Sequence, residues 1–263
     1  MGFQPILPFG GMAGWTFLQR TQEAQKQAFN AAPEIRRDTE YFAEKIGEVT
    51  SAEDLVGDYR LLKVALGAFG LDDDLPNKAF IRKVLEEGAL DPTSFANRMV
   101  DKRYLALTEA FGFDLGTPNT ALSDFPARIL DAYKTRQFEI AVGAQDNDMR
   151  LALSMERDLG AIVDADNTAN GKWYAVMGNE PLRQMFETAL GLPSTLAALD
   201  IDDQLTMFRD RAKAIFGSGE VAQFADPHAR DELNRLFLVR SQINAGRAAM
   251  SSGSIALTLL QTR

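Results

Sequence analysis

Side chains that could support catalysis or bind a metal are few in this sequence and lie far apart. There is one histidine, His228, which excludes sites that need two imidazoles, and there is no cysteine to act as a nucleophile or metal ligand. His228 follows Pro227 in the expected first turn of a helix, where the helix dipole disfavours a charged imidazole. Because no nucleophile elbow supplies it with a serine partner, we expect a surface or capping role for His228 and no catalytic residue.

Three acidic segments have the composition of a cation site but not its register. In the loop from Asp166 to Gly171 the glycine stands at position six, as in a calcium-binding EF-hand, but position twelve is Met177 instead of glutamate. The segments 72–74 and 200–203 could bind a cation weakly, but they suit the N-terminal ends of helices, where negative charge is favourable. The sequence therefore predicts no metal site.

Glycine-rich loops that bind phosphate are also not recognisable. Residues 10–14 lack the lysine and the preceding strand of a P-loop, and residues 217–219 lack the third glycine of a dinucleotide fingerprint. Carboxylates distant in sequence could still meet in space, so an enzyme that uses paired carboxylates is a remote alternative. The main expectation is a protein that is not an enzyme and binds no cofactor.

Composition limits the class of protein further. The 263 residues carry a net charge of −9, with acidic residues spread along the chain, which disfavours binding to nucleic acid. No apolar run approaches the ~20 residues that span a bilayer, so no membrane insertion is expected. Residues 1–14 are apolar but lack the basic region of a secretory signal peptide, which favours a cytoplasmic location unless another export route is used.

Glycines predict where the helices that carry these side chains end. A glycine closes a helix because it adopts the left-handed conformation without a Cβ penalty. Four such stops are expected, at Gly70, Gly112, Gly191 and Gly217. The segments that end at Gly70 and Gly112 are similar enough to predict two related helical hairpins in the N-terminal half. The uneven spacing of the four glycines argues against a regular solenoid.

Helix starts are marked by prolines and by short polar side chains. Ser51 and Asp54 are spaced as a capping box, and prolines in a first turn usually begin a helix. Expected starts of this second kind are Pro33, Asp91-Pro92, Pro181 and Asp226-Pro227. Apolar residues recur at helical spacing nearly throughout, and alternating patterns are scarce. We therefore expect an all-α fold, an irregular multi-helix bundle.

The domain organisation is expected to follow from these helices. Residues 1–30 are expected to form an N-terminal arm, and residues 31–245 a single helical domain in two halves with a break near 115–120, where Gly116 and Pro118 lie. Residues 246–263 form a nearly uncharged tail. Its apolar residues could contact another protein chain or dock on the core: Ile255, Leu257, Leu259 and Leu260.

A family resemblance runs from about residue 30 to 240. It is carried by Tyr133 and by residues 37–42, 65–71, 94–98, 101–104, 110–113, 136–139, 142–143, 150–153, 181–183, 189–193 and 200–204. In these segments the chain resembles a bacterial, mainly alphaproteobacterial, domain-of-unknown-function family that is encoded near flagellar genes. The resemblance carries no established activity, so it implies no catalytic residue.

The resemblance and the sequence together predict a flagellum-associated structural or accessory protein. It would work through protein–protein contacts, with flagellar components or with copies of itself, and could be exported by the flagellar secretion apparatus. A cytosolic helical chaperone or adaptor that holds flagellar subunits before export is the alternative.

Overall fold

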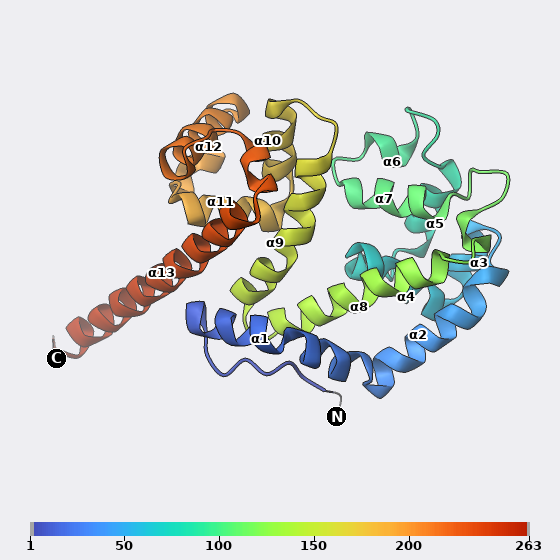
Figure 1. Cartoon of the computed structure of the whole chain (residues 1–263), viewed down its shortest axis with the longest axis horizontal. Helices are drawn as coiled ribbons and strands as arrows, with labels where there is room; N and C mark the ends of the chain where they lie inside the picture. Colours follow the sequence, from blue (N-terminus) through green and yellow to red (C-terminus); the bar gives the residue numbers. More distant parts are fainter. Residues whose placement is uncertain (1–2, 262–263) are drawn as a thin grey trace. The chain divides into compact units, whose positions relative to one another are not determined.

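The computed structural model describes residues 3–261, with side chains from residue 3 to residue 247. In this described range the chain forms thirteen α-helices, five short 3-10 helices and no strand (Figure 1). The predicted all-α multi-helix bundle is therefore confirmed. None of the described helices combines the length and the apolar character needed to cross a membrane.

The helices divide into two compact units. Unit 1 comprises residues 3–6 and 21–141, and unit 2 comprises residues 7–20 and 142–261. Unit 1 contains α2 (Pro33–Lys45), α3 (Ala52–Gly57), α4 (Tyr59–Phe69), α5 (Lys78–Glu87), α6 (Phe95–Arg98) and α7 (Lys102–Phe111). Unit 2 contains α9 (Asn147–Asp164), α10 (Ala169–Gly178), α11 (Glu180–Leu190), α12 (Ile201–Phe216) and α13 (Pro227–Gln261). Two helices, α1 (Gly11–Asn30) and α8 (Phe125–Gly143), have residues in both units.

The predicted break near 115–120 lies inside unit 1, and the division between the units falls between residues 141 and 142. The segment is held in place by its own polar side chains. Thr120 is buried and donates to the Val49 carbonyl (2.7 Å), and the Asn119 amide donates to the Ala110 carbonyl (3.0 Å) at the end of α7. Gly116 and Pro118 therefore mark a turn within the core of unit 1, not a linker between two domains.

The N-terminal segment is a packed helix for most of its length, instead of the predicted arm over residues 1–30. Leu18 on α1 is fully buried, and Phe29 is buried with its ring edge-on to Phe138 (centroids 5.8 Å apart). The Gln25 side chain accepts from the Ile6 amide (2.6 Å) and donates to the Ile6 carbonyl (3.2 Å). Residues before α1 are therefore fastened to the helix by a pair of hydrogen bonds.

All four predicted helix stops are confirmed. The glycines that follow α4, α7, α11 and α12 have φ of 71°, 59°, 65° and 89°. The capping box of Ser51 and Asp54 is also present, with both reciprocal hydrogen bonds. The start at Asp91 is wrong, because its carboxylate accepts from the amide and hydroxyl of Thr93 and closes a turn, and α6 begins at Phe95.

The two units repeat one arrangement of helices. Asp58 ends α3 and caps the start of α4, and Asn179 likewise ends α10 and caps the start of α11. The side chain of Asp58 accepts from the Leu61 amide, and the side chain of Asn179 accepts from the Leu182 amide. Each pair of equivalent residues is separated by 121 positions in the sequence.

The equivalence extends to the buried face and to the end of the helix. Four pairs of residues 121 positions apart are buried in both helices: Leu61, Val64, Ala65 and Ala68 in α4, and Leu182, Met185, Phe186 and Ala189 in α11. Gly70 and Gly191 end the two helices with the same separation. The amide after each glycine donates back to a carbonyl five residues earlier, from Leu71 to Leu66 and from Leu192 to Glu187 (both 2.9 Å). This closure is the Schellman motif.

The environment of Tyr104 in α7 should make the stability of unit 1 depend on pH in the alkaline range. Its hydroxyl donates to Asp74 (2.5 Å), and burial, followed by this hydrogen bond, raises the pKa of Tyr104 from 10.0 to about 12. The unfolded chain then loses the phenol proton at a lower pH than the folded chain. The contribution of Tyr104 to stability is therefore complete below pH 10 and is lost as the pH rises from 10 to 12.

We expect the free energy of unfolding to fall by about 1–2 kcal/mol more over this pH range in the wild type than in Tyr104→Phe. Urea titrations followed by circular dichroism at pH 9 to 12 measure this difference. Tyr59→Phe is the matched control, because Tyr59 is 57% exposed. Parallel pH profiles for the wild type and Tyr104→Phe would contradict the prediction.

Candidate functional site: an arginine pocket at the end of α11

The candidate site in unit 2 forms where α11 ends. The last carbonyls of an α-helix have no partner within the helix and carry partial negative charge. At this end Arg240 of α13 donates to the Ala189 carbonyl (2.6 Å), and Arg211 of α12 donates more weakly to the Gly191 carbonyl (3.4 Å). A Cβ on Gly191 would lie 2.8 Å from the Arg240 guanidinium, so the glycine also makes room for this contact.

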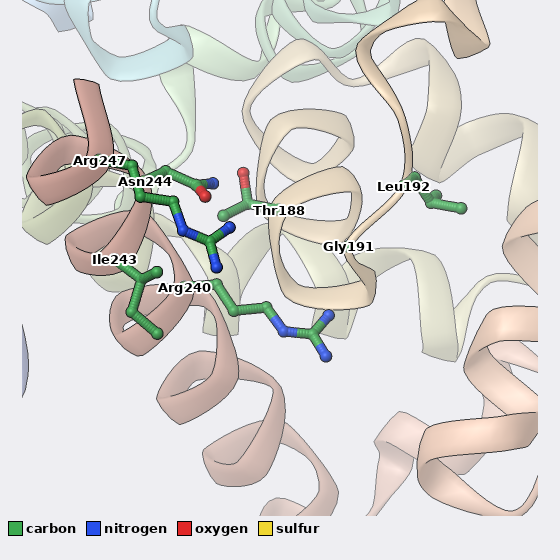
Figure 2. Close-up of a pocket in the computed structure, with 7 residues that line it drawn as sticks. All are labelled: Thr188, Gly191, Leu192, Arg240, Ile243, Asn244 and Arg247. Atoms are coloured by element: carbon green, nitrogen blue, oxygen red, sulfur yellow. The ribbon is translucent and has the colours of Figure 1, made fainter. Parts of the chain in front are cut away.

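A pocket of about 400 Å³ opens beside these arginines. It is lined by Thr188, Gly191, Leu192, Arg240, Ile243, Asn244 and Arg247 (Figure 2). The four lining residues from α13 are spaced at i, i+3, i+4 and i+7, which places them on one face of the helix. Figure 2 shows the side chains of Arg240 and Arg247 both extending from α13 toward the last turns of α11.

The pocket is electropositive within an acidic chain. Among the residues that the structure describes, no carboxylate forms an ion pair with Arg211, Arg240 or Arg247. The nearby Glu187 is instead paired with Arg183 (2.7 Å). Arg240 and Arg211 are partly used as caps of α11, whereas Arg247 makes no hydrogen bond within the described part of the chain. Its guanidinium is therefore available to an anion from outside.

Unit 1 contains the same helix end with a carboxylate in place. Arg136 donates to the Ala68 carbonyl (2.9 Å), and Arg103 donates to the Gly70 carbonyl (2.5 Å). These carbonyls are equivalent to those of Ala189 and Gly191. Asp101 holds Arg103 by bonds of 2.7–3.1 Å to its Nε and Nη2 atoms. Burial raises the pKa of Asp101, but the bonds from Arg103 outweigh this effect and the net pKa is lowered.

The polar residues singled out in the sequence do not meet at this pocket. His228 is exposed in the first turn of α13, and its amide donates to Asp226 (3.0 Å), as expected for a helix start. In the loop checked for calcium, Thr168 caps α10 by accepting from the Gly171 amide (3.0 Å). No cluster of three metal-ligand side chains occurs among the described residues.

The other acidic segments and the tail also lie elsewhere in the chain. Residues 72–74 form a 3-10 helix in which Asp72 accepts from Gln137 (2.7 Å) and Asp74 from Tyr104. Residues 200–203 start α12, but Asp200 makes no capping bond with its side chain. The predicted contact residues Ile255, Leu257, Leu259 and Leu260 are within the helical backbone of α13, and their side chains lie outside the described residues.

Sequence reasoning missed the arginine pocket. A detectable signal was present, because Arg240, Ile243, Asn244 and Arg247 share one helical face and follow the last buried residues of α13. The spacing of these residues could not predict that this face lies close to Gly191, which is about fifty residues earlier in the sequence. That contact depends on how α11 and α13 pack.

A second polar cluster, buried in unit 1, has no room for a ligand. Lys63 is paired with Asp38 (2.7 Å), and the Tyr133 hydroxyl lies 3.5 Å from the same carboxylate. Burial, followed by the charges of Asp38 and Asp72, raises the pKa of Tyr133. The Tyr133 ring fills the space beside α4, since a Cβ on Gly67 would lie only 2.9 Å from it. We therefore read this cluster as structural.

A family model described as "Protein of unknown function (DUF1217)" matches residues 68–229, a segment that includes α11 and Arg211 but ends before Arg240. The crystal structure of protein AGR_C_984 from Agrobacterium tumefaciens is 28% identical, with a TM-score of 0.73, and the match covers 92% of this chain and 99% of that one. No curated protein matches significantly.

Proposed function

The chain belongs to the DUF1217 family, and on that premise we propose that it acts without catalysis, through contacts that the C-terminal part of α13 makes with other proteins. The observation that carries the proposal is the length of this helix. It has 35 residues, which is far more than its own core covers.

The first half of α13 is anchored in unit 2. Leu233, Phe237 and Leu238 are buried, and α13 packs against α11, α9 and the 3-10 helix Val221–Ala225. From Gln242 to Arg247 every side chain is exposed, including Ile243 at 47%. The helical backbone nevertheless continues to Gln261.

Such a continuation suits a helix that gains its stability from a partner. Isolated helices of ~12–15 residues are marginal in water, and most helices in proteins are stabilised by packing of an apolar face. Residues 248–261 contain no charged side chain and include Ile255, Leu257, Leu259 and Leu260. A helix with this composition is of the kind that binds in an apolar groove or pairs with another helix.

We further propose that the partners are flagellar components, which would make the protein a flagellum-associated structural or accessory protein. This finer proposal rests on the family resemblance alone. Export through the flagellar secretion apparatus belongs to the same proposal. A chaperone that holds flagellar subunits in the cytosol is the alternative within it.

The test combines a tail variant with motility and fractionation. We expect the double change Leu259→Glu, Leu260→Glu to reduce swimming and to release the tagged protein from purified flagella and basal bodies, because two carboxylates cannot be buried in an apolar contact. The control is Leu199→Glu, at an exposed apolar residue outside α13 (42% exposed). Recovery of the wild type with unassembled subunits in the cytosol would favour the chaperone. Wild-type swimming and fractionation of the tail variant would contradict the proposal.

A further inference from the structure

We propose that the arginine pocket between the end of α11 and α13 binds a carboxylate of an acidic segment of a partner protein, with an adjoining apolar side chain resting on Leu192 and Ile243. The inference rests on the proposed function and deepens it, because it names the chemistry of the partner. The contact would lie on the same helix as the tail, at residues 240–247.

The charges at this helix end favour a carboxylate as the ligand. Among the described residues no carboxylate pairs with Arg211, Arg240 or Arg247 at this helix end, where the nearby Glu187 is held by Arg183. Residues 241–263 contain no acidic residue. The cap contacts use one nitrogen of Arg240 and one of Arg211. A guanidinium has five N–H donors, so most donors at this site are unused. Carboxylates bind such groups through paired, charge-assisted hydrogen bonds.

The internal repeat also favours a carboxylate at this position. At the equivalent helix end in unit 1, Arg136 and Arg103 bind the two equivalent carbonyls. Asp101 supplies the carboxylate that holds Arg103. Unit 2 has the arginines but no counterpart of Asp101 that reaches Arg211 or Arg240. An acidic side chain from another polypeptide would complete in unit 2 the arrangement that unit 1 completes within its own chain.

The other residues that line the pocket favour a peptide ligand. Thr188 and Asn244 can donate to the second oxygen of a carboxylate, whereas Leu192 and Ile243 present apolar surface. A volume of about 400 Å³ accommodates one or two side chains and is too small for a folded element. The mixture of cationic and apolar groups favours a peptide over a free inorganic anion. The net charge of −9 disfavours nucleic acid.

Fluorescence anisotropy with labelled decapeptides tests the proposal. One peptide has three Leu-Asp steps separated by glycines, and the other has asparagine in place of each aspartate. We expect the full-length protein to bind the acidic peptide and not the amide peptide. Arg247→Glu should weaken binding at least tenfold, because it replaces attraction by repulsion. Lys78→Glu in unit 1 makes the same change of charge at an exposed residue outside the pocket and should leave binding unchanged.

Further measurements separate the possible outcomes. Arg247 makes no hydrogen bond among the described residues, so thermal unfolding of Arg247→Glu should match the wild type. A peptide with lysine in place of aspartate should bind the variant better than it binds the wild type. Equal binding of the acidic and amide peptides, or no effect of Arg247→Glu, would overturn the inference. So would displacement of the peptide by an equal concentration of inorganic phosphate, which would indicate a simple anion site.

The failure of this inference is distinguishable from that of the proposed function. The tail variant Leu259→Glu, Leu260→Glu leaves the pocket residues unchanged, and its swimming and fractionation are scored without the peptide. If the tail variant is defective and peptide binding is absent, the protein contact stands and the pocket assignment falls. If the tail variant is normal and the peptide binds, the pocket assignment stands and the proposed contact of the tail falls.

Discussion

Replacing Trp173 by alanine is expected to lower the free energy of unfolding of unit 2 by about 3–5 kcal/mol, the range for deleting a large buried aromatic side chain. Trp173 is fully buried on α10 and packs edge-on against Phe186 (5.5 Å between ring centroids) and at an angle against Phe208 (5.7 Å). Its indole N–H donates to the Gly219 carbonyl (2.9 Å). Alanine would leave a cavity between three helices and remove this bond.

Hydrogen exchange measures the effect within unit 2, because protection of the α11 amides reports its opening free energy. Trp15→Ala is the control, since Trp15 is half-buried and belongs to the same unit. It should cost markedly less than Trp173→Ala. Equal losses of protection in the two variants would show that α10 is not central to this core.

The second large effect is expected at the buried ion pair of unit 1. Lys63→Gln should destabilise unit 1 by about 1–3 kcal/mol, because it leaves the Asp38 carboxylate, whose side chain is only 12% exposed, without its cation. The expected loss of stability is smaller than for a fully buried ion pair, because the Lys63 side chain is 29% exposed. The Tyr133 hydroxyl, at 3.5 Å, is too distant to replace the ammonium group.

The internal repeat suggests a second substitution that should restore the stability lost in Lys63→Gln. In unit 2 the position equivalent to Lys63 is Gln184. Tyr133 lies three residues before Arg136, and Phe237 lies three residues before Arg240, which binds the equivalent carbonyl. We therefore expect Asp38→Met in the Lys63→Gln background to restore most of the lost stability, because methionine removes the carboxylate that Lys63→Gln leaves without a cation and fills its place with an apolar side chain. Hydrogen exchange of α4 in the two single variants and the double variant gives the coupling energy. Additive losses would refute the rescue.

An exposed ion pair of unit 1 should contribute much less to stability than the pair of Lys63 and Asp38. Arg36 and Glu40 on α2 are 3.7 Å apart, and their side chains are 61% and 69% exposed. Arg36→Gln should change the stability of unit 1 by less than about 0.5 kcal/mol. The contrast with Lys63→Gln separates the effect of burial from that of removing a charge.

Helix ends were the most predictable part of the fold, because they are decided by a few neighbouring residues. A glycine in the left-handed conformation and a side chain that accepts from an amide two or three positions later act within one turn. This is why the stops at Gly70 and Gly191 and the capping box at Ser51 follow from the sequence. The error at Asp91 has the same local origin, since an aspartate that closes a turn looks like one that starts a helix.

Contacts between distant residues could not be predicted from one sequence. Asp38, Lys63 and Tyr133 have ordinary spacing, and only the packing of α2, α4 and α8 brings them together. The arginines at Gly70 and Gly191 come from helices tens of residues away. The two related hairpins were predicted from the similarity of the segments ending at Gly70 and Gly112, whereas the residue equivalent to Gly70 is Gly191. Some pairs 121 positions apart keep their residue type, such as Gly70 and Gly191, but others differ, such as Asp58 and Asn179.

Unit 2 contains residues 7–20 as well as residues from 142 onward, so its segments are synthesised at widely separated times. Gly11, at the start of α1, lies against the side chain of Gln242 in α13, and Gly10 lies near Asp146. Ribosomes add about 5–20 residues per second, so Gly11 leaves the peptidyl-transferase centre roughly 10–50 s before Gln242 does. Unit 1 can fold while the chain is still being translated. The last contacts of unit 2 form only when the residues around Gly11 meet the residues around Gln242, which are synthesised much later.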